Sequence, residues 1–193
     1  SSTLRVRYES ETSVVTAVES LSKVAAVEYA EPNRYRETYA TPNDPSFPVQ
    51  WGLTKINCPA AWDRTTGSGN VVVAVLDTGI DLVHPDLAAL LVQGRDLVDL
   101  GPNPIPPAGF HFEGDFMGRD NNPQDEVGHG THVAGTIACS SNNATGVAGV
   151  TWNCRLMPVK VLTRIVHNND PTDVRGVGST ADIAAGIRYA VDP

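Results

Sequence analysis

The sequence is 193 residues long, 41% of its residues are hydrophobic, and its formal net charge at pH 7 is -8. This length allows one domain with a core, and the composition excludes a fibrous or disordered chain. The acidic balance, with basic residues scattered along the chain, argues against a nucleic-acid partner, and no apolar run approaches the ~20 residues that would cross a membrane.

The first 30 residues predict a strand, a helix and a second strand. Residues 4–8 alternate between apolar and polar side chains, Thr12 or Ser13 can cap a helix that runs to about Ser22, and residues 26–29 form a short strand. This unit is too small to bury a core by itself.

A polar, proline-containing stretch at residues 31–48 shows no apolar periodicity and predicts an exposed linker between two domains. Beyond it, strands and helices alternate: a β-branched run at 71–76, helical spacing at 131–138, a second strand at 156–162 and an amphipathic helix at 180–191. This alternation predicts an α/β fold with a mainly parallel sheet.

A segment rich in glycine and proline lies between Asp99 and Asp120. Its composition predicts neither helix nor strand, so we expect one long loop. Loops of this kind lie on the surface and often border functional sites.

The three cysteines, Cys58, Cys139 and Cys154, leave two interpretations open. They are compatible with one disulfide and one free thiol, or with three buried small hydrophobic side chains. If a disulfide forms, we expect Cys139 to pair with Cys154, because the helix after residue 129 should return to the sheet edge where the strand after Cys154 begins.

The predicted strand 71–76 is followed directly by Asp77-Thr78-Gly79. This places a carboxylate at the carboxyl edge of a parallel sheet, where open α/β proteins bind their ligands. An aspartate here can also simply cap a turn. The same three residues occur in aspartic proteases, but that mechanism needs two such carboxylates, and the sequence has no second Asp-Thr-Gly.

A second candidate is His129, which is surrounded by small residues in Gly128-His129-Gly130-Thr131-His132. At a helix start, an imidazole can accept a proton from a hydroxyl if a carboxylate holds its other nitrogen. His129 and His132 could instead bind a metal, although the HExxH pattern is absent, or serve as core histidines. The core role is the one expected for His132.

Two long motifs around these residues closely resemble those of the subtilases, a family of serine proteases. They are Val75–Ile80 with His84–Leu87, and His129–Thr136; the family carries Asp, His and Ser in this chain order. Residues 41–45 are similar to the start of thermitase-type members, and the segment before them resembles the end of the family's inhibitory propeptide.

The resemblance implies a subtilisin-type α/β fold, a parallel sheet with helices on both faces, here incomplete and preceded by part of an α+β propeptide. Residues 1–40 would be the C-terminal part of the propeptide with its linker, cleaved near Ala40-Thr41. Residues 41–193 would be the N-terminal part of the catalytic domain.

The same resemblance implies an extracellular serine endopeptidase that acts on proteins or peptides. Asp77 would orient His129, and His129 would be the general base. The family's serine lies in a Gly-Thr-Ser-Met-Ala motif, which occurs nowhere in this sequence, and Ser179 is better interpreted as a helix cap. We therefore expect this chain alone to be inactive. The alternatives are a noncatalytic fragment or pseudoprotease that binds or inhibits, and one chain of a split protease whose other half is a second chain.

Finally, the resemblance implies sites for substrate and for structural calcium. The substrate would bind along Gly176, Val177 and Gly178. The calcium ligands would be oxygens of three separated segments, and oxygen donors are what this ion prefers: Asp44, Asp86, Ser140, Asn143, Thr145 and Val147. A second cluster resembles another calcium site of the family: Asp96, Asp99, Asp120, Asn122 and Gln124.

Overall fold

The computed structural model describes residues 6, 13–32 and 40–192, and the chain forms two compact units, residues 1–38 and 39–193. In the first unit, α1 (Val14–Leu21) begins after Ser13, whose hydroxyl accepts a hydrogen bond from the Thr16 amide at 3.2 Å. This confirms the predicted helix and identifies Ser13 as its cap.

The strand predicted at residues 26–29 is wrong. The segment turns instead, and the Val27 amide donates to the Val24 carbonyl at 2.8 Å. So short a strand is stable only when it pairs with others in a sheet. The strand predicted at residues 4–8 lies outside the described residues, apart from Val6.

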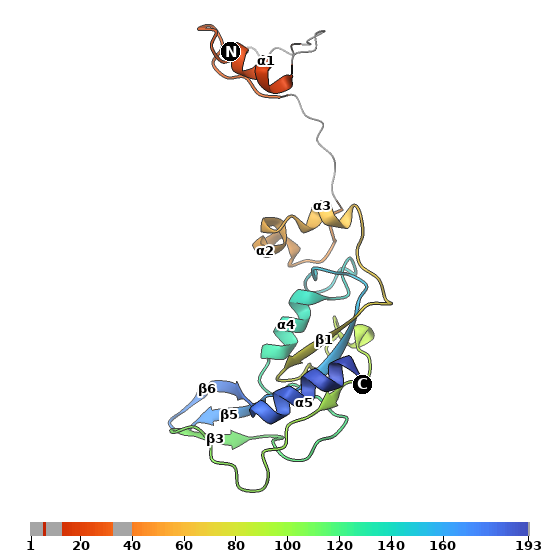
Figure 1. Cartoon of the computed structure of the whole chain (residues 1–193), viewed down its shortest axis with the longest axis vertical. Helices are drawn as coiled ribbons and strands as arrows, with labels where there is room; N and C mark the ends of the chain where they lie inside the picture. The colour runs from red at the N-terminus through yellow and green to blue at the C-terminus, as the bar shows by residue number, and fades with distance from the viewer. Residues whose placement is uncertain (1–5, 7–12, 33–39, 193) are drawn as a thin grey trace. The chain divides into compact units, whose positions relative to one another are not determined.

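The second unit is built on a parallel sheet of strand order β1-β4-β2, formed by β1 (Val72–Asp77), β4 (Arg155–Lys160) and β2 (Arg95–Asp96) (Figure 1). Strands β1 and β4 confirm the predictions at 71–76 and 156–162 to within two residues at each end. The register places Asp77, Lys160 and Asp96 side by side at the carboxyl ends of the strands.

Helices α4 (His129–Ile137) and α5 (Thr180–Val191) cover opposite faces of this sheet. Val75 packs in one buried cluster with Ala134 of α4, while Leu76 packs in another with Ala185 of α5. Successive residues of a strand point to opposite faces, so the two helices lie on different sides. The predicted α/β fold with helices on both faces is confirmed.

A second sheet, which is antiparallel, contains β3 (Phe110–Glu113), β5 (Thr163–His167) and β6 (Asp170–Val177) in the order β3-β5-β6 (Figure 1). The prediction that residues 99–120 form only a loop is therefore wrong. Phe110 and Phe112 alternate with polar residues, but the partner strand β5 lies far along the chain, so local composition concealed the strand.

The segment before β1 packs around Trp62. The centroid of the Trp62 ring lies 5.8 Å from that of the Phe47 ring and 5.1 Å from that of the Trp152 ring. Asp44 is only 2% exposed, so the predicted linker at 31–48 is too long at its C-terminal end. The elements here and after β1 are short: η1 (Phe47–Val49), α2 (Trp51–Lys55), α3 (Cys58–Trp62) and η2 (Ala88–Leu90).

All three cysteines are buried free thiols. Of the two interpretations that the sequence left open, the three buried small side chains are confirmed, and the Cys139–Cys154 disulfide does not form. Both residues pack in the core cluster beneath α4. Burial, followed by the charges of Asp86 and Asp44, raises the pKa of the Cys139 thiol to about 12. A thiol that stays protonated behaves as a small hydrophobic side chain.

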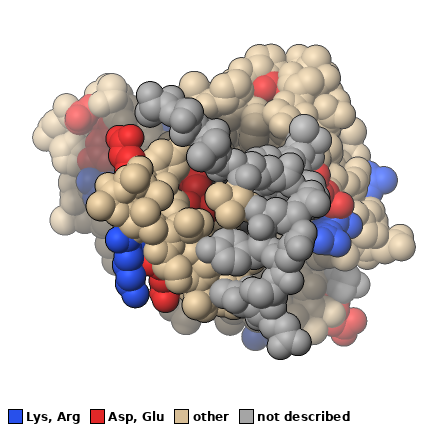
Figure 2. Space-filling view, turned by 90° about the horizontal axis from the view of Figure 1, so that it is seen from above, with Lys and Arg blue, Asp and Glu red and all other residues tan. Residues whose placement is uncertain are grey.

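Figure 2 shows one face of the molecule, on which the described Lys and Arg side chains stand apart among acidic and uncharged residues. Within residues 13–32 and 40–192, no helix has the length and apolarity needed to span a membrane.

Candidate active site

Asp77 and His129 meet where β1 ends and α4 begins. The His129 Nδ1 atom lies 2.7 Å from Oδ1 and 2.9 Å from Oδ2 of Asp77. The structure thus joins the two residues predicted to be catalytic, although 52 positions separate them in the sequence. Asp77 is 8% exposed and the His129 side chain is 64% exposed, so the imidazole lies at the surface of this chain and the carboxylate does not.

The electrostatics of this pair suit a general base. When Nδ1–H donates to Asp77, the other ring nitrogen, Nε2, is left as an acceptor. The hydrogen bond to Asp77, and then its negative charge, raises the pKa of His129. The pair can therefore take a proton from a hydroxyl and hold it as a stabilised imidazolium.

The close approach of β1 to α4 depends on Gly130. A Cβ atom on this residue would lie 2.1 Å from the Gly79 carbonyl oxygen and 3.1 Å from the Asp77 Cβ. Any side chain at position 130 would therefore push the helix away from Asp77. This is the physical reason for a small residue directly after His129.

The residues predicted to bind substrate, Gly176, Val177 and Gly178, lie at the end of β6 and just beyond it. Strand β6 pairs only with β5 among the described strands, which leaves its other edge open. A Cβ atom on Gly176 would lie 2.6 Å from the side chain of Thr78, which directly follows Asp77. A Cβ atom on Gly178 would lie 2.1 Å from the Val161 carbonyl oxygen, so this glycine is also required by packing.

The segments predicted to bind calcium converge at Asp44 and Asp86, which are both buried. Asn143 bridges them: its amide N–H lies 3.4 Å from Asp44 Oδ1, and its Nδ2 donates to Asp86 Oδ1 at 2.8 Å. The other three predicted ligands, Ser140, Thr145 and Val147, donate backbone hydrogen bonds to Asp86 or to Asn143. The Ser140 amide donates to the Asp86 carbonyl at 2.9 Å, the Val147 amide to Asp86 Oδ2 at 3.2 Å, and the Thr145 amide to Asn143 Oδ1 at 2.8 Å.

The sequence pattern described as "Subtilase family" matches residues 68–192 of this chain. The chain belongs to the subtilase family. It is 38% identical to a thermophilic serine proteinase of Bacillus sp. strain AK1, over 93% of this chain and 38% of that protein. It is 39% identical to thermitase of Thermoactinomyces vulgaris, over 79% of this chain and 44% of that protein.

A solved protease structure from Pseudoalteromonas arctica PAMC 21717 has the same fold, with a TM-score of 0.60 and 39% identity over 78% of this chain and 44% of that one. The chain therefore spans less than half the length of these relatives and covers the N-terminal part of the subtilase fold. Further relatives are named extracellular proteases, and one is named an intracellular serine protease.

The second histidine of the subtilase motif does not behave as expected. His132 is exposed on α4, so the prediction of a core role is wrong. Among the described residues, the cluster of side chains whose spacing suits a metal ion consists of aspartates and contains neither histidine.

That cluster only partly matches the predicted second calcium site. Asp96 and Asp120 are joined by Asp115, which the sequence had not indicated, and oxygens of the three lie within 4.8 Å of one another. The Lys160 ammonium lies 3.0 Å from Asp96 and 3.1 Å from Glu126. Burial opposes the charge on Lys160, but these two carboxylates outweigh it and raise its pKa. A buried cation thus already balances part of the cluster.

The other members of the predicted second cluster have different partners. Gln124 Oε1 accepts from the Leu82 amide at 3.1 Å, and Asp99 Oδ1 from the Gly101 amide at 3.4 Å. The Asn122 amide donates to Asp120 Oδ1 at 2.7 Å, which closes a turn. The structure therefore gives this second site less support than the first.

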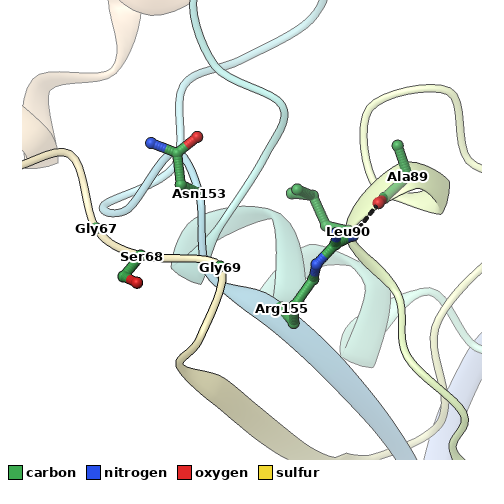
Figure 3. Close-up of a pocket in the computed structure, with 7 residues that line it drawn as sticks. All are labelled: Gly67, Ser68, Gly69, Ala89, Leu90, Asn153 and Arg155. Atoms are coloured by element: carbon green, nitrogen blue, oxygen red, sulfur yellow. Dashed lines mark hydrogen bonds between the residues drawn. The ribbon is translucent and has the colours of Figure 1, made fainter.

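Two open pockets flank the sheet at opposite ends. One, of about 480 Å³, lies where Gly67–Gly69 lead into β1; Asn153 and Arg155 line it, and the Arg155 guanidinium donates to the Ala89 carbonyl at 2.7 Å (Figure 3). It lies at the amino end of β1, away from Asp77. The other, of about 440 Å³, borders the start of α4 and is lined by Asp81, Gln124, Asp125, Glu126, Val127, Gly128 and Thr131.

Proposed function

We propose that the complete gene product, called the parent protease below, is a serine-type endopeptidase that hydrolyses peptide bonds of proteins. The observation that carries this proposal is the Asp77–His129 hydrogen bond at the carboxyl edge of the sheet, in a chain of the subtilase family. Asp77 orients the imidazole and stabilises its cation. His129 accepts the proton of the attacking serine and then gives it to the leaving amine.

The attacking serine lies outside these 193 residues in this proposal, since the family's Gly-Thr-Ser-Met-Ala motif is not among them. Ser179 has another role that supports this view. Its hydroxyl accepts from the Asp182 amide at 3.0 Å and donates to Asp182 Oδ2 at 2.7 Å, which caps α5.

Hydrolysis of a chromogenic peptide by the parent protease tests the function. We expect turnover that a serine-directed covalent inhibitor abolishes, because an organophosphorus reagent of this kind reacts readily with an activated serine hydroxyl and blocks the acyl-enzyme. Turnover that resists the inhibitor would point to another nucleophile. Absence of turnover would favour a noncatalytic binding or inhibitory module, or one chain of a split protease.

The N-terminal unit is the C-terminal part of an inhibitory propeptide in this proposal, and residues 41–193 begin the catalytic domain. The division of the chain into units 1–38 and 39–193 supports a boundary near Ala40-Thr41. The propeptide segment would then be a partner of the catalytic domain until it is cleaved. The relatives named as extracellular proteases support action outside the cell.

The substrate binds as an added strand along Gly176, Val177 and Gly178. The open edge of β6 supports this placement, because unpaired backbone groups on an edge can bind an extended peptide. The edge also lies beside Thr78, one residue from the catalytic carboxylate. Main-chain hydrogen bonds would supply affinity there, and side-chain pockets would supply preference.

Calcium occupies the site at Asp44 and Asp86 in this proposal. No ion pair joins either buried carboxylate to a basic side chain among the residues that the structure describes. Two buried carboxylates without a cation favour a bound metal ion, and carboxylate, amide and carbonyl oxygens suit calcium. Asn143 turns its amide nitrogen toward Asp86, so this side chain must rotate to bind calcium through oxygen. Bound calcium would hold the three segments together.

Chelation should lower the melting temperature of the parent protease. Calcium at about 100 times its Kd stabilises the folded form by about 2.7 kcal/mol, which corresponds to a shift of roughly 3 °C in a protein about twice as long as this chain. Thermal melts with calcium and with chelator measure the shift. Asp44→Asn should remove the difference, whereas Asp63→Asn, which alters an exposed carboxylate bound to the Ala40 amide, should keep it. Equal midpoints for the unaltered protein would contradict the site.

A further inference from the structure

Asp125 lies four residues before His129 and collects hydrogen bonds from several directions. Its Oδ1 accepts from the Thr78 hydroxyl at 2.8 Å and from the Val127 and Gly128 amides at 2.9 and 2.8 Å. Its Oδ2 accepts from the amide and the hydroxyl of Thr131 at 2.9 and 2.6 Å. One partly buried carboxylate thus satisfies donors from three separate turns of the backbone.

These donors come from both sides of the catalytic pair. Thr78 follows Asp77 directly, and its hydroxyl also accepts from the Gly130 amide at 2.9 Å. Thr131 lies in the first turn of α4, and its hydroxyl accepts from the Asp81 amide at 2.9 Å. The turn after β1 and the start of α4 are therefore joined by two direct hydrogen bonds, and Asp125 adds a third connection by accepting from both Thr78 and Thr131.

A carboxylate suits this position better than an amide. Five donors converge on two oxygens, whereas asparagine offers one oxygen and would turn two N–H donors toward the remaining groups. Burial alone would raise the pKa of Asp125, but the hydrogen bonds from Thr131, Gly128 and Val127 outweigh it and lower the pKa. The group therefore stays ionised near neutral pH.

We infer that Asp125 is a positioning residue, which sets the distance between Asp77 and His129 by bonding Thr78 to the first turn of α4. The inference rests on the proposed function. It differs from the triad assignment because Asp125 acts through Thr78 and the helix start, while the carboxylate on the imidazole is Asp77.

Asp125→Asn in the parent protease should lower kcat by about 100-fold, with KM changed by less than about threefold. A displacement of about 1 Å in a catalytic group costs a rate factor of this order. Values of kcat are taken per active site, by titration with a covalent inhibitor, at a temperature where the variant is folded. Asp170→Asn is the matched control, because Asp170 also accepts from a threonine amide and hydroxyl, at the exposed start of β6. It should leave kcat within twofold.

Thr78→Val tests whether Asp125 acts through Thr78, and it does so without changing any charge. The valine has a similar volume but cannot donate to Asp125 or accept from Gly130, so kcat should fall, and Thr78→Ser should restore most of it. The double variant Asp125→Asn, Thr78→Val should lose less activity than the product of the two single losses, since both remove the hydrogen bond between Thr78 and Asp125. Additive losses would mean that Asp125 does not act through Thr78.

A measurement that needs no turnover separates this inference from the proposed function. NMR titration of the His129 ring should show a lower pKa in Thr78→Val than in the unaltered protein, because a looser contact with Asp77 raises the pKa less. A lowered melting temperature with unchanged kcat and unchanged His129 titration would overturn the positioning role. If the unaltered protease has no activity, the proposed function fails, and the titration still decides whether Thr78, to which Asp125 is bonded, positions His129.

Discussion

Asp77→Asn in the parent protease is expected to lower kcat by about 10⁴-fold while KM changes little. The amide no longer stabilises the imidazolium, and it can hold the ring in the wrong tautomer. Since Asp77 is nearly buried beneath His129, the substitution should leave substrate contacts in place. Peptide hydrolysis under saturating and limiting substrate measures both constants.

His132→Gln is the matched control, because it alters an exposed residue one turn further along the same helix. It should keep kcat within about twofold. A loss below tenfold in Asp77→Asn would contradict the catalytic assignment.

The pH dependence of activity tests the Asp77–His129 pair in a second way. The kcat/KM of the parent protease should fall as pH drops through the raised pKa of His129, because a protonated imidazole cannot accept the serine proton. In Asp77→Asn the acid limb should move to lower pH, since the hydrogen bond and charge that raise this pKa are gone. An acid limb at the same pH in both proteins would mean that another group controls it.

A polypeptide limited to residues 1–193 is expected to show no peptidase turnover, and activity should return when the remaining chain is supplied. Asp77 and His129 can prepare a base, but no acyl-enzyme forms without the nucleophile. The exposed stripe of α5, formed by Ile183, Ile187 and Val191, should also make this polypeptide prone to association. The assay is hydrolysis of a chromogenic peptide, with and without a serine-directed inhibitor.

Ser179→Ala in the parent protease is the companion variant. It should keep kcat within about twofold and cost about 1 kcal/mol of stability, because only the cap of α5 is lost. Inhibitor-sensitive turnover by residues 1–193 alone, abolished by this substitution, would identify Ser179 as the nucleophile and refute the proposal.

Two strands of the main sheet, the helices α1, α4 and α5, and the candidate pair Asp77 and His129 were predictable from the sequence alone. The β-branched run before Asp77 favours a strand covered on both faces, and the regular apolar spacing of α4 and α5 predicts a helix for each. Two motifs that resemble the subtilases then placed Asp77 and His129 together. Such local patterns allow a helix, a strand or a motif to be predicted, because each depends on a few neighbouring residues.

Features that depend on partners far apart in the sequence became visible only in the folded chain. Strand β3 exists because β5 pairs with it, although local composition predicted a loop. The thiols of Cys139 and Cys154 stay free in the core, a choice that the sequence left open. The importance of Asp125 emerged in the same way, since its donors come from separate turns that only folding brings together. Sequence patterns indicate which secondary structure a segment favours. Strand pairing, burial and convergent hydrogen bonds depend on how distant segments of the chain fold together.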